Sequence, residues 1–186
     1  MGEAGRASAS SYWRGGVRAT LHGEVPARAE EAASPRFLVD GMAIKLGKYL
    51  RCLGYDAEWD VRVPTRGLAR RAAAEDRVLL TRNTRVGFEL APPSRWLALD
   101  SEDPRQQLYQ VVEAFDLDMH ALLFSRCILC NVELETVADR EQVRDHVPER
   151  VLERYEIFYA CPRCGTVFWK GTHVARTCRK LGIDWS

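Results

Sequence analysis

Four cysteines lie in two Cys-x-x-Cys pairs in the last third of the chain. Cys127 and Cys130 form the first pair, and Cys161 and Cys164 form the second pair thirty residues further on. One such turn presents two thiolates to one side of a tetrahedral zinc ion, and a second turn supplies the other two. Gly165 follows the second pair and suits the tight backbone of this kind of turn. The spacing therefore predicts one structural zinc ion bound by all four cysteines.

The alternative interpretation of these pairs is two redox-active dithiols. A redox motif opens a helix directly after a strand, and neither pair is expected to do so. His173 is an alternative zinc ligand within the same module. Cys52 falls on an apolar helix face, where we expect a buried thiol, and Cys178 is expected to lie outside the zinc site.

Polar residues follow three of the strands that the apolar pattern predicts. Asp40 follows the first, Asn83 lies two residues beyond the third, and Asp100 and Asp103 follow the fourth. In an open parallel sheet, ligands bind outside the carboxyl ends of the strands. Oxygen ligands gathered there would hold Mg²⁺ or Mn²⁺, which can activate water for phosphodiester cleavage. These four residues are the candidate catalytic group.

Each acid also has an ordinary structural alternative. Asp103 suits the N-cap of a helix that has Pro104 as its first residue and Gln106 as its capping-box partner. Asp100 suits a solvated loop. Asp40 closes a buried strand and needs a partner, either Lys45 on the following helix or a metal ion.

Apolar runs alternate with helix-spaced segments from residue 36 to residue 115. The pattern predicts an α/β fold, with a mostly parallel sheet flanked by helices. Gly54 is expected to cap the first helix at its carboxyl end. The predicted strands cover residues 36–40, 56–59, 77–81 and 96–99, and the predicted helices cover residues 42–53, 68–76, 84–90 and 103–115.

Three regions follow from this pattern. Residues 1–35 have no sustained apolar period and are expected to form a flexible tail. Residues 36–123 form the α/β domain. Residues 124–186 form the zinc-ribbon module, in which residues 139–154 look helical and residues 173–181 form a basic helix at the carboxyl end.

The overall charge of the 186-residue chain is nearly balanced. It carries 27 Lys and Arg against 26 Asp and Glu, so a basic surface can arise only from folding. The sequence has no hydrophobic signal region and no apolar run of about 18 residues, so no membrane partner is expected. Cysteines paired for metal binding favour a reducing, cytoplasmic location.

Several longer motifs give the chain a more specific resemblance. From residue 36 to about residue 180, it resembles the Mut-7 C-terminal ribonuclease domain family. The motifs that carry the resemblance are Phe37-Leu38-Val39-Asp40-Gly41-Met42, Lys45-Leu46, Leu50-Arg51-Cys52-Leu53-Gly54-Tyr55-Asp56, Arg77-Val78-Leu79-Leu80-Thr81-Arg82, Asp103-Pro104-Arg105-Gln106-Gln107-Leu108, Leu123-Phe124-Ser125-Arg126-Cys127, Arg144-Asp145-His146-Val147-Pro148 and Cys161-Pro162-Arg163-Cys164-Gly165.

This resemblance implies a PIN-like nuclease fold with a zinc ribbon at its carboxyl end. It also implies metal-dependent ribonuclease chemistry, with Asp40 as the first metal-binding acid. Two positions depart from the family pattern: Asn83 replaces an Asp, and residues 64–67 replace an acidic run before the second helix. With fewer carboxylates, the site is expected to bind a divalent cation more weakly.

Three functions are compatible with these features. The first is a metal-dependent ribonuclease whose RNA substrate contacts Lys45, Arg51 and Arg82. The second is a catalytically weakened or inactive RNA-binding or adaptor protein, and the third is a protein-interaction module that uses the ribbon's edge strands. For the second, further phosphate contacts are expected from Arg163, Lys170, Arg176, Arg179 and Lys180.

Overall fold

The main sheet has five strands in the order β1-β5-β4-β2-β3. The structure is a computed structural model that describes residues 21–22, 34–88 and 95–184. Four neighbouring strands are parallel, as predicted: β2 (Phe37–Val39), β3 (Ala57–Trp59), β4 (Val78–Thr81) and β5 (Trp96–Ala98). The short strand β1 (Leu21–His22) pairs antiparallel with β5.

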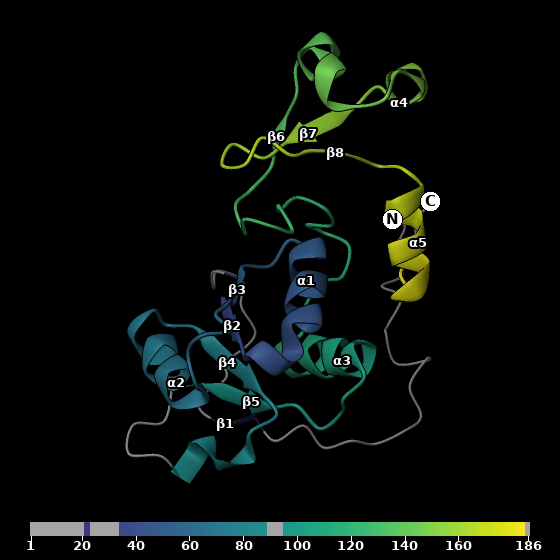
Figure 1. Cartoon of the computed structure of the whole chain (residues 1–186). Coiled ribbons are helices and arrows are strands. Elements are labelled where there is room, and N and C mark those ends of the chain that lie inside the picture. The colour runs from purple at the N-terminus through teal and green to yellow at the C-terminus, as the bar shows by residue number, and fades with distance from the viewer. Residues whose placement is uncertain (1–20, 23–33, 89–94, 185–186) are drawn as a thin grey trace, which may run out of the picture.

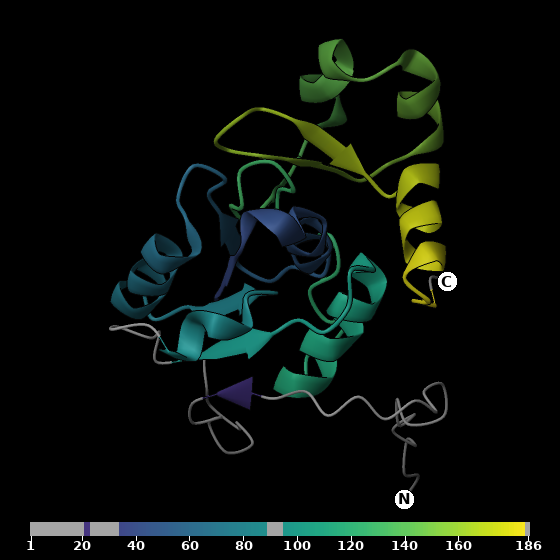
Figure 2. The same ribbon diagram turned by 60° about the horizontal axis from the view of Figure 1, so that its bottom comes forward.

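Helices cover both faces of this sheet (Figures 1 and 2). The helices α1 (Ile44–Cys52) and α3 (Pro104–Phe115) pack on one face, and α2 (Thr65–Ala74) packs on the other. A 3₁₀ turn, η2 (Gly41–Ala43), leads from Asp40 into α1. A second, η3 (Thr84–Phe88), occupies most of the predicted helix 84–90, whose last two residues lie outside the described ranges.

The helix that follows β2 shows why the sequence folds this way. Leu46 and Leu50 are fully buried in the main core, as their helical spacing predicts. Gly54 ends the helix with a φ of +89°, which glycine adopts without strain. Gly47 allows Trp59 to pack closely, because a Cβ at position 47 would lie 2.8 Å from the Trp59 ring. Met42 has the same helical spacing, four residues before Leu46, but it is exposed and does not share the buried face.

The carboxyl-terminal module is an antiparallel sheet of β6 (Glu135–Thr136), β7 (Phe158–Ala160) and β8 (Val167–Trp169). Its small core is separate from the main one and contains Val143, Val147, Leu152 and Phe158. The predicted helical stretch 139–154 divides into η4 (Arg140–His146) and α4 (Glu149–Arg154). The break falls at Val147, because the residue before a proline disfavours the helical conformation.

The last helix, α5 (Thr172–Lys180), returns to the main domain beside α3 (Figure 1). Cys178, Leu181 and Ile183 belong to the main core, and the Tyr109 hydroxyl donates to the Leu181 carbonyl at 2.7 Å. The segment therefore packs with the α/β domain although it follows the ribbon in sequence. Of the predicted tail 1–35, Leu21–His22 form β1, while residues 1–20 and 23–33 lie outside the described ranges. No helix in the described ranges is both long enough and apolar enough to cross a bilayer.

Candidate metal centre and candidate active site

The two cysteine pairs come together in the ribbon. The sulfur atoms of Cys127, Cys130, Cys161 and Cys164 all lie within 4.8 Å of one another, and the Cys127 and Cys164 sulfurs are 3.9 Å apart. Zn–S bonds of about 2.3 Å place tetrahedral sulfurs about 3.8 Å apart. The four thiols can therefore bind a metal ion such as zinc. His173 is not part of this cluster.

Crowding makes the four thiols difficult to ionise together. The hydrogen bond to Cys164 and burial raise the pKa of Cys130 to about 12. The Thr166 hydroxyl stabilises the thiolate form of Cys164 and lowers the pKa of Cys164 to about 6. A bound divalent cation would compensate the negative charge of four thiolates, so this cluster has the donor chemistry of a metal site.

The first cysteine turn is attached to the edge strand β3 by two polar side chains. The Asn131 amide oxygen accepts from the Ala57 N–H at 3.1 Å, while its amide nitrogen donates to Asp56 at 2.6 Å and to Glu58 at 2.9 Å. Arg51 donates to the carbonyls of Ile128 and Leu129 at 2.8 and 3.0 Å. The metal centre and the sheet are thereby connected.

The structure corrects the expected place of Arg51 on an RNA-facing surface. Its side chain is 3% exposed, stacks 3.7 Å from the Trp59 ring centre and pairs with Glu58. Its Nε atom donates to the Ala57 carbonyl at 2.7 Å. Burial lowers the pKa of Arg51 to about 10, and Glu58 opposes this effect. Arg51 therefore joins α1, β3 and the cysteine turn as a structural residue.

Asp40 lies directly beyond β2 and is nearly buried, with 9% exposure. One carboxylate oxygen accepts from the Met42 N–H at 3.2 Å, and the other accepts from the hydroxyls of Thr65 at 3.1 Å and Thr81 at 2.8 Å. These donors replace the expected ion pair with Lys45, whose side chain is exposed. Of the roughly four lone pairs of a carboxylate, three are therefore occupied.

Asn83 is connected to Asp40 through Thr81. The Asn83 N–H donates to the Thr81 hydroxyl at 3.0 Å, and that hydroxyl donates to Asp40. The Asn83 side-chain oxygen accepts from the Arg85 N–H at 3.0 Å and begins η3. Neither Thr65 nor Thr81 was predicted from the sequence. The available signal for Thr81 was its position as the one polar residue of the β4 run.

The carboxyl ends of β2, β4 and β5 lie at one edge of the sheet, because these strands are adjacent and parallel. Asp100, two residues beyond β5, accepts from the Gln110 amide at 3.0 Å. Asp103 caps α3 and accepts from the Arg105 N–H at 2.7 Å. Within the ranges that the structure describes, the four cysteines are the only group of three or more Cys, His, Asp or Glu donors close enough to share a metal ion.

One detail at the start of α3 differs from the prediction. The capping box is indirect: the Ser101 hydroxyl accepts from the Asp103 N–H and donates to the Gln106 side chain at 2.6 Å.

Arg82 forms an ion pair with Glu102 at 2.6 Å and is 30% exposed. Arg82 therefore remains near the strand ends, with part of its charge compensated.

A protein-family model described as the Mut7-C RNAse domain matches residues 35–181. The chain belongs to this family. No curated protein and no solved structure matches the chain. This family membership agrees with the resemblance predicted from the sequence motifs. The parallel sheet and the cysteine cluster both lie within the matched RNase domain.

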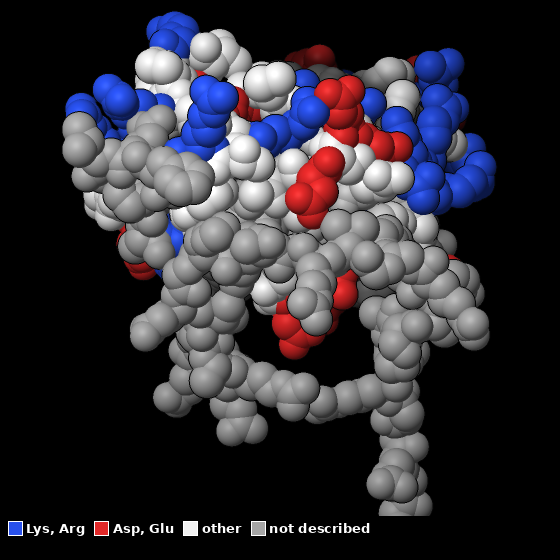
Figure 3. Space-filling model, turned by 90° about the horizontal axis from the view of Figure 1, so that it is seen from below, with Lys and Arg blue, Asp and Glu red and all other residues white. Residues whose placement is uncertain are grey.

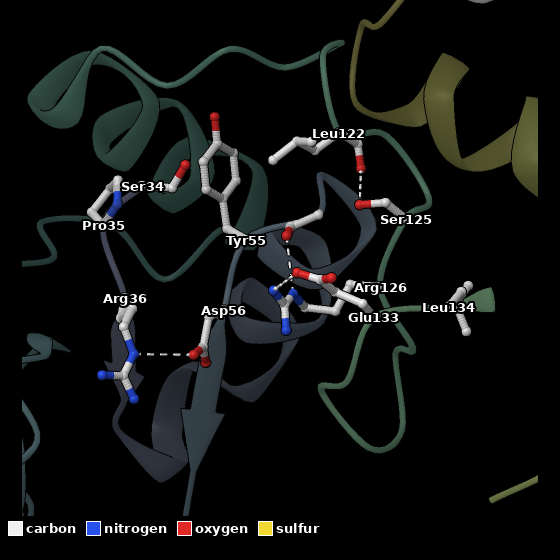
Figure 4. Close-up of a pocket in the computed structure, with 11 residues that line it drawn as sticks. Ser34, Pro35, Arg36, Tyr55, Asp56, Leu122, Ser125, Arg126, Glu133 and Leu134 are labelled. Atoms are coloured by element: carbon white, nitrogen blue, oxygen red, sulfur yellow. Dashed lines mark hydrogen bonds and ion pairs between the residues drawn. The ribbon is translucent and has the colours of Figure 1, made fainter. Parts of the chain in front are cut away.

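A hollow in the Mut7-C domain is lined by side chains from the segments before β2 and β3 and from the segment before the ribbon sheet (Figure 4). Its lining includes Arg36 and Asp56, which form an ion pair at 3.2 Å just before β2 and β3, together with Tyr55, Leu122 and Arg126. It therefore lies at the amino ends of the strands, whereas Asp40 lies at the carboxyl ends. We assign the hollow no part in the candidate active site.

Surface charge in the Mut7-C protein is separated locally, although it is balanced overall. The face seen from below carries groups of Lys and Arg at both sides and a group of Asp and Glu nearer its middle (Figure 3).

Proposed function

We propose that this Mut7-C protein is a divalent-metal-dependent ribonuclease that hydrolyses RNA phosphodiester bonds. The observation that supports this most is Asp40, a nearly buried carboxylate at the end of the interior strand β2, within a matched RNase domain. Its three donors fix the carboxylate in one orientation. A cytoplasmic location remains our prediction from the cysteine chemistry.

Asp40 and Asn83 are the residues that we propose would hold Mg²⁺ or Mn²⁺. Mg²⁺ commonly uses one or two protein carboxylates and completes its shell with water and substrate phosphate. Asp40 keeps about one free lone pair for this role, while Asp100 and Asp103 add negative charge to the same edge. When bound, the cation would activate water and stabilise the leaving oxygen.

The zinc centre has a different role in this proposal. Four cysteines form a closed donor set with no position left for substrate, so we propose that Zn²⁺ there is structural. Lys45 and Arg82 are the proposed RNA contacts at the catalytic edge. Lys45 is exposed on α1, and Arg82 follows β4.

Replacing Asp40 by asparagine should reduce RNA cleavage at least about a hundredfold, because the anionic metal ligand is lost while the side-chain shape is kept. The measurement is cleavage of labelled single-stranded RNA against Mn²⁺ concentration. Asp116→Asn is the matched control, since Asp116 is an exposed acid at the far end of α3 with a φ of +50°, which asparagine tolerates. Wild-type cleavage that survives Asp40→Asn would contradict the proposed site.

Replacing Asn83 by aspartate should lower the Mn²⁺ concentration needed for half-maximal cleavage by about tenfold. The added carboxylate raises the charge of the ligand set and can still accept the Arg85 N–H. Thr84→Asp is the control, because it places the same charge one residue further along the chain. An unchanged Mn²⁺ requirement in Asn83→Asp, or an equal gain in Thr84→Asp, would exclude position 83 from the site.

The alternative function is a non-catalytic RNA-binding or adaptor protein. The observation in its favour is that Asp100 and Asp103 have local hydrogen-bond partners and form no metal-ligand cluster with Asp40. RNA binding without cleavage, in the wild type and in Asn83→Asp alike, would support this alternative.

A further inference from the structure

Two apolar side chains are exposed beside Asp40. Met42 is 75% exposed and Val61 is 67% exposed, the two highest values among the large hydrophobic side chains that the structure describes. Single exposed apolar residues are common on protein surfaces. Two of them beside a candidate catalytic carboxylate form one local apolar surface.

Met42 and Val61 come from different segments that meet at Gly41. A Cβ atom at position 41 would lie 3.5 Å from the Val61 Cα and 3.7 Å from its Cγ1. Met42 is the next residue, and its N–H donates to Asp40 at 3.2 Å. The loop that carries Val61 leads into α2, whose first residue, Thr65, donates to Asp40. The apolar pair therefore lies at the candidate site itself.

Cationic side chains border this apolar pair. Lys45 follows Met42 by three residues, lies in the first turn of α1 and is exposed. Arg62 follows Val61 and is 88% exposed, with a 3.4 Å ion pair to Asp60. Exposed surface pairs of this kind are weak. An apolar surface beside exposed cations matches a nucleotide, which combines a flat base with a charged phosphate.

We propose that Met42 and Val61 contact the face of an unpaired nucleobase next to the phosphate that the cation at Asp40 would bind, so that the substrate is single-stranded RNA. This inference rests on the proposed function, because it takes RNA as the ligand at Asp40. Bases in a duplex are covered by their neighbours, whereas unpaired bases offer their faces to side chains. Methionine suits such a contact, since its unbranched, polarizable side chain adapts to the partner.

The test is RNA binding, followed by fluorescence anisotropy, in full-length protein that carries Asp40→Asn to prevent cleavage. The ligands are a short single-stranded RNA, the same strand with abasic positions, and the matching duplex. The Met42→Ala, Val61→Ala pair should bind single-stranded RNA about tenfold more weakly. Binding of the abasic strand and of the duplex should change little. Leu129→Ala with Ile157→Ala is the control, because both residues are similarly exposed but belong to the ribbon.

Three results would overturn the inference: unchanged binding by the Met42, Val61 variant, an equal loss for the abasic strand, or an equal loss in the ribbon control. Thermal unfolding of both double variants should match that of the parent, because all four side chains are exposed. Cleavage is measured separately with Asp40 intact. If the protein binds RNA through the bases but does not cleave it, the proposed nuclease activity is refuted and the Met42 and Val61 contact is supported. If it cleaves RNA but binding is unchanged in the Met42, Val61 variant, the nuclease activity is supported and the contact is refuted.

Discussion

Replacing Cys127 and Cys161 by serine should abolish metal binding and unfold the ribbon. The purified wild type should contain one zinc ion per chain, and the double variant should contain none. Zinc in small structural sites contributes about 10–16 kcal/mol of apparent binding energy. The ribbon core holds four buried apolar side chains and cannot replace that contribution. Elemental analysis measures the metal, and hydrogen exchange of β7 and β8 measures the folding.

The control for this experiment is Cys52→Ala. It removes a buried thiol outside the cluster, where burial raises the pKa to about 12. Its zinc content should therefore remain one per chain. The prediction fails if the Cys127, Cys161 double variant retains zinc, or if β7 and β8 keep their exchange protection without the metal.

Replacing Arg51 by methionine should destabilise the protein by about 3–5 kcal/mol, because breaking a buried ionic network leaves its partners unpaired. The carbonyls of Ala57, Ile128 and Leu129 would lose their donor, and Glu58 would lose its counter-ion. Denaturant unfolding measures the free energy. Arg51→Lys should also be destabilising, since one ammonium group cannot reach all these acceptors or stack as well on Trp59.

The same substitution should loosen the metal site. Arg51 holds two carbonyls of the turn between Cys127 and Cys130, so Arg51→Met should release zinc to a chelator faster than the wild type does. Lys48→Met is the matched control, because Lys48 is an exposed cation on the same helix. Equal stability and equal zinc release in the two variants would mean that Arg51 does not connect the sheet to the metal site.

Local chemistry made much of this protein predictable from its sequence. The fully apolar run of β2, the helical spacing of Leu46 and Leu50, and the position of Gly54 each act within a few residues. The cysteine pairs are equally local, since each turn presents two sulfurs by itself. The parallel sheet then followed from the alternation of strands and helices, and Asp103 and Pro104 began α3 as their types suggested.

The tertiary structure alone decided which side chains became partners. Arg51 has the sequence character of a surface cation, but the cysteine turn that buries it lies 77 residues further along the chain. Asp40 finds its hydroxyl donors 25 and 41 residues away, and no local pattern relates these positions. Met42 fits the helical spacing of the buried face, yet it precedes α1 and is exposed beside Asp40. Periodicity predicts the elements because each apolar pattern spans only a few consecutive residues, whereas the partners of a buried charge depend on how those elements pack.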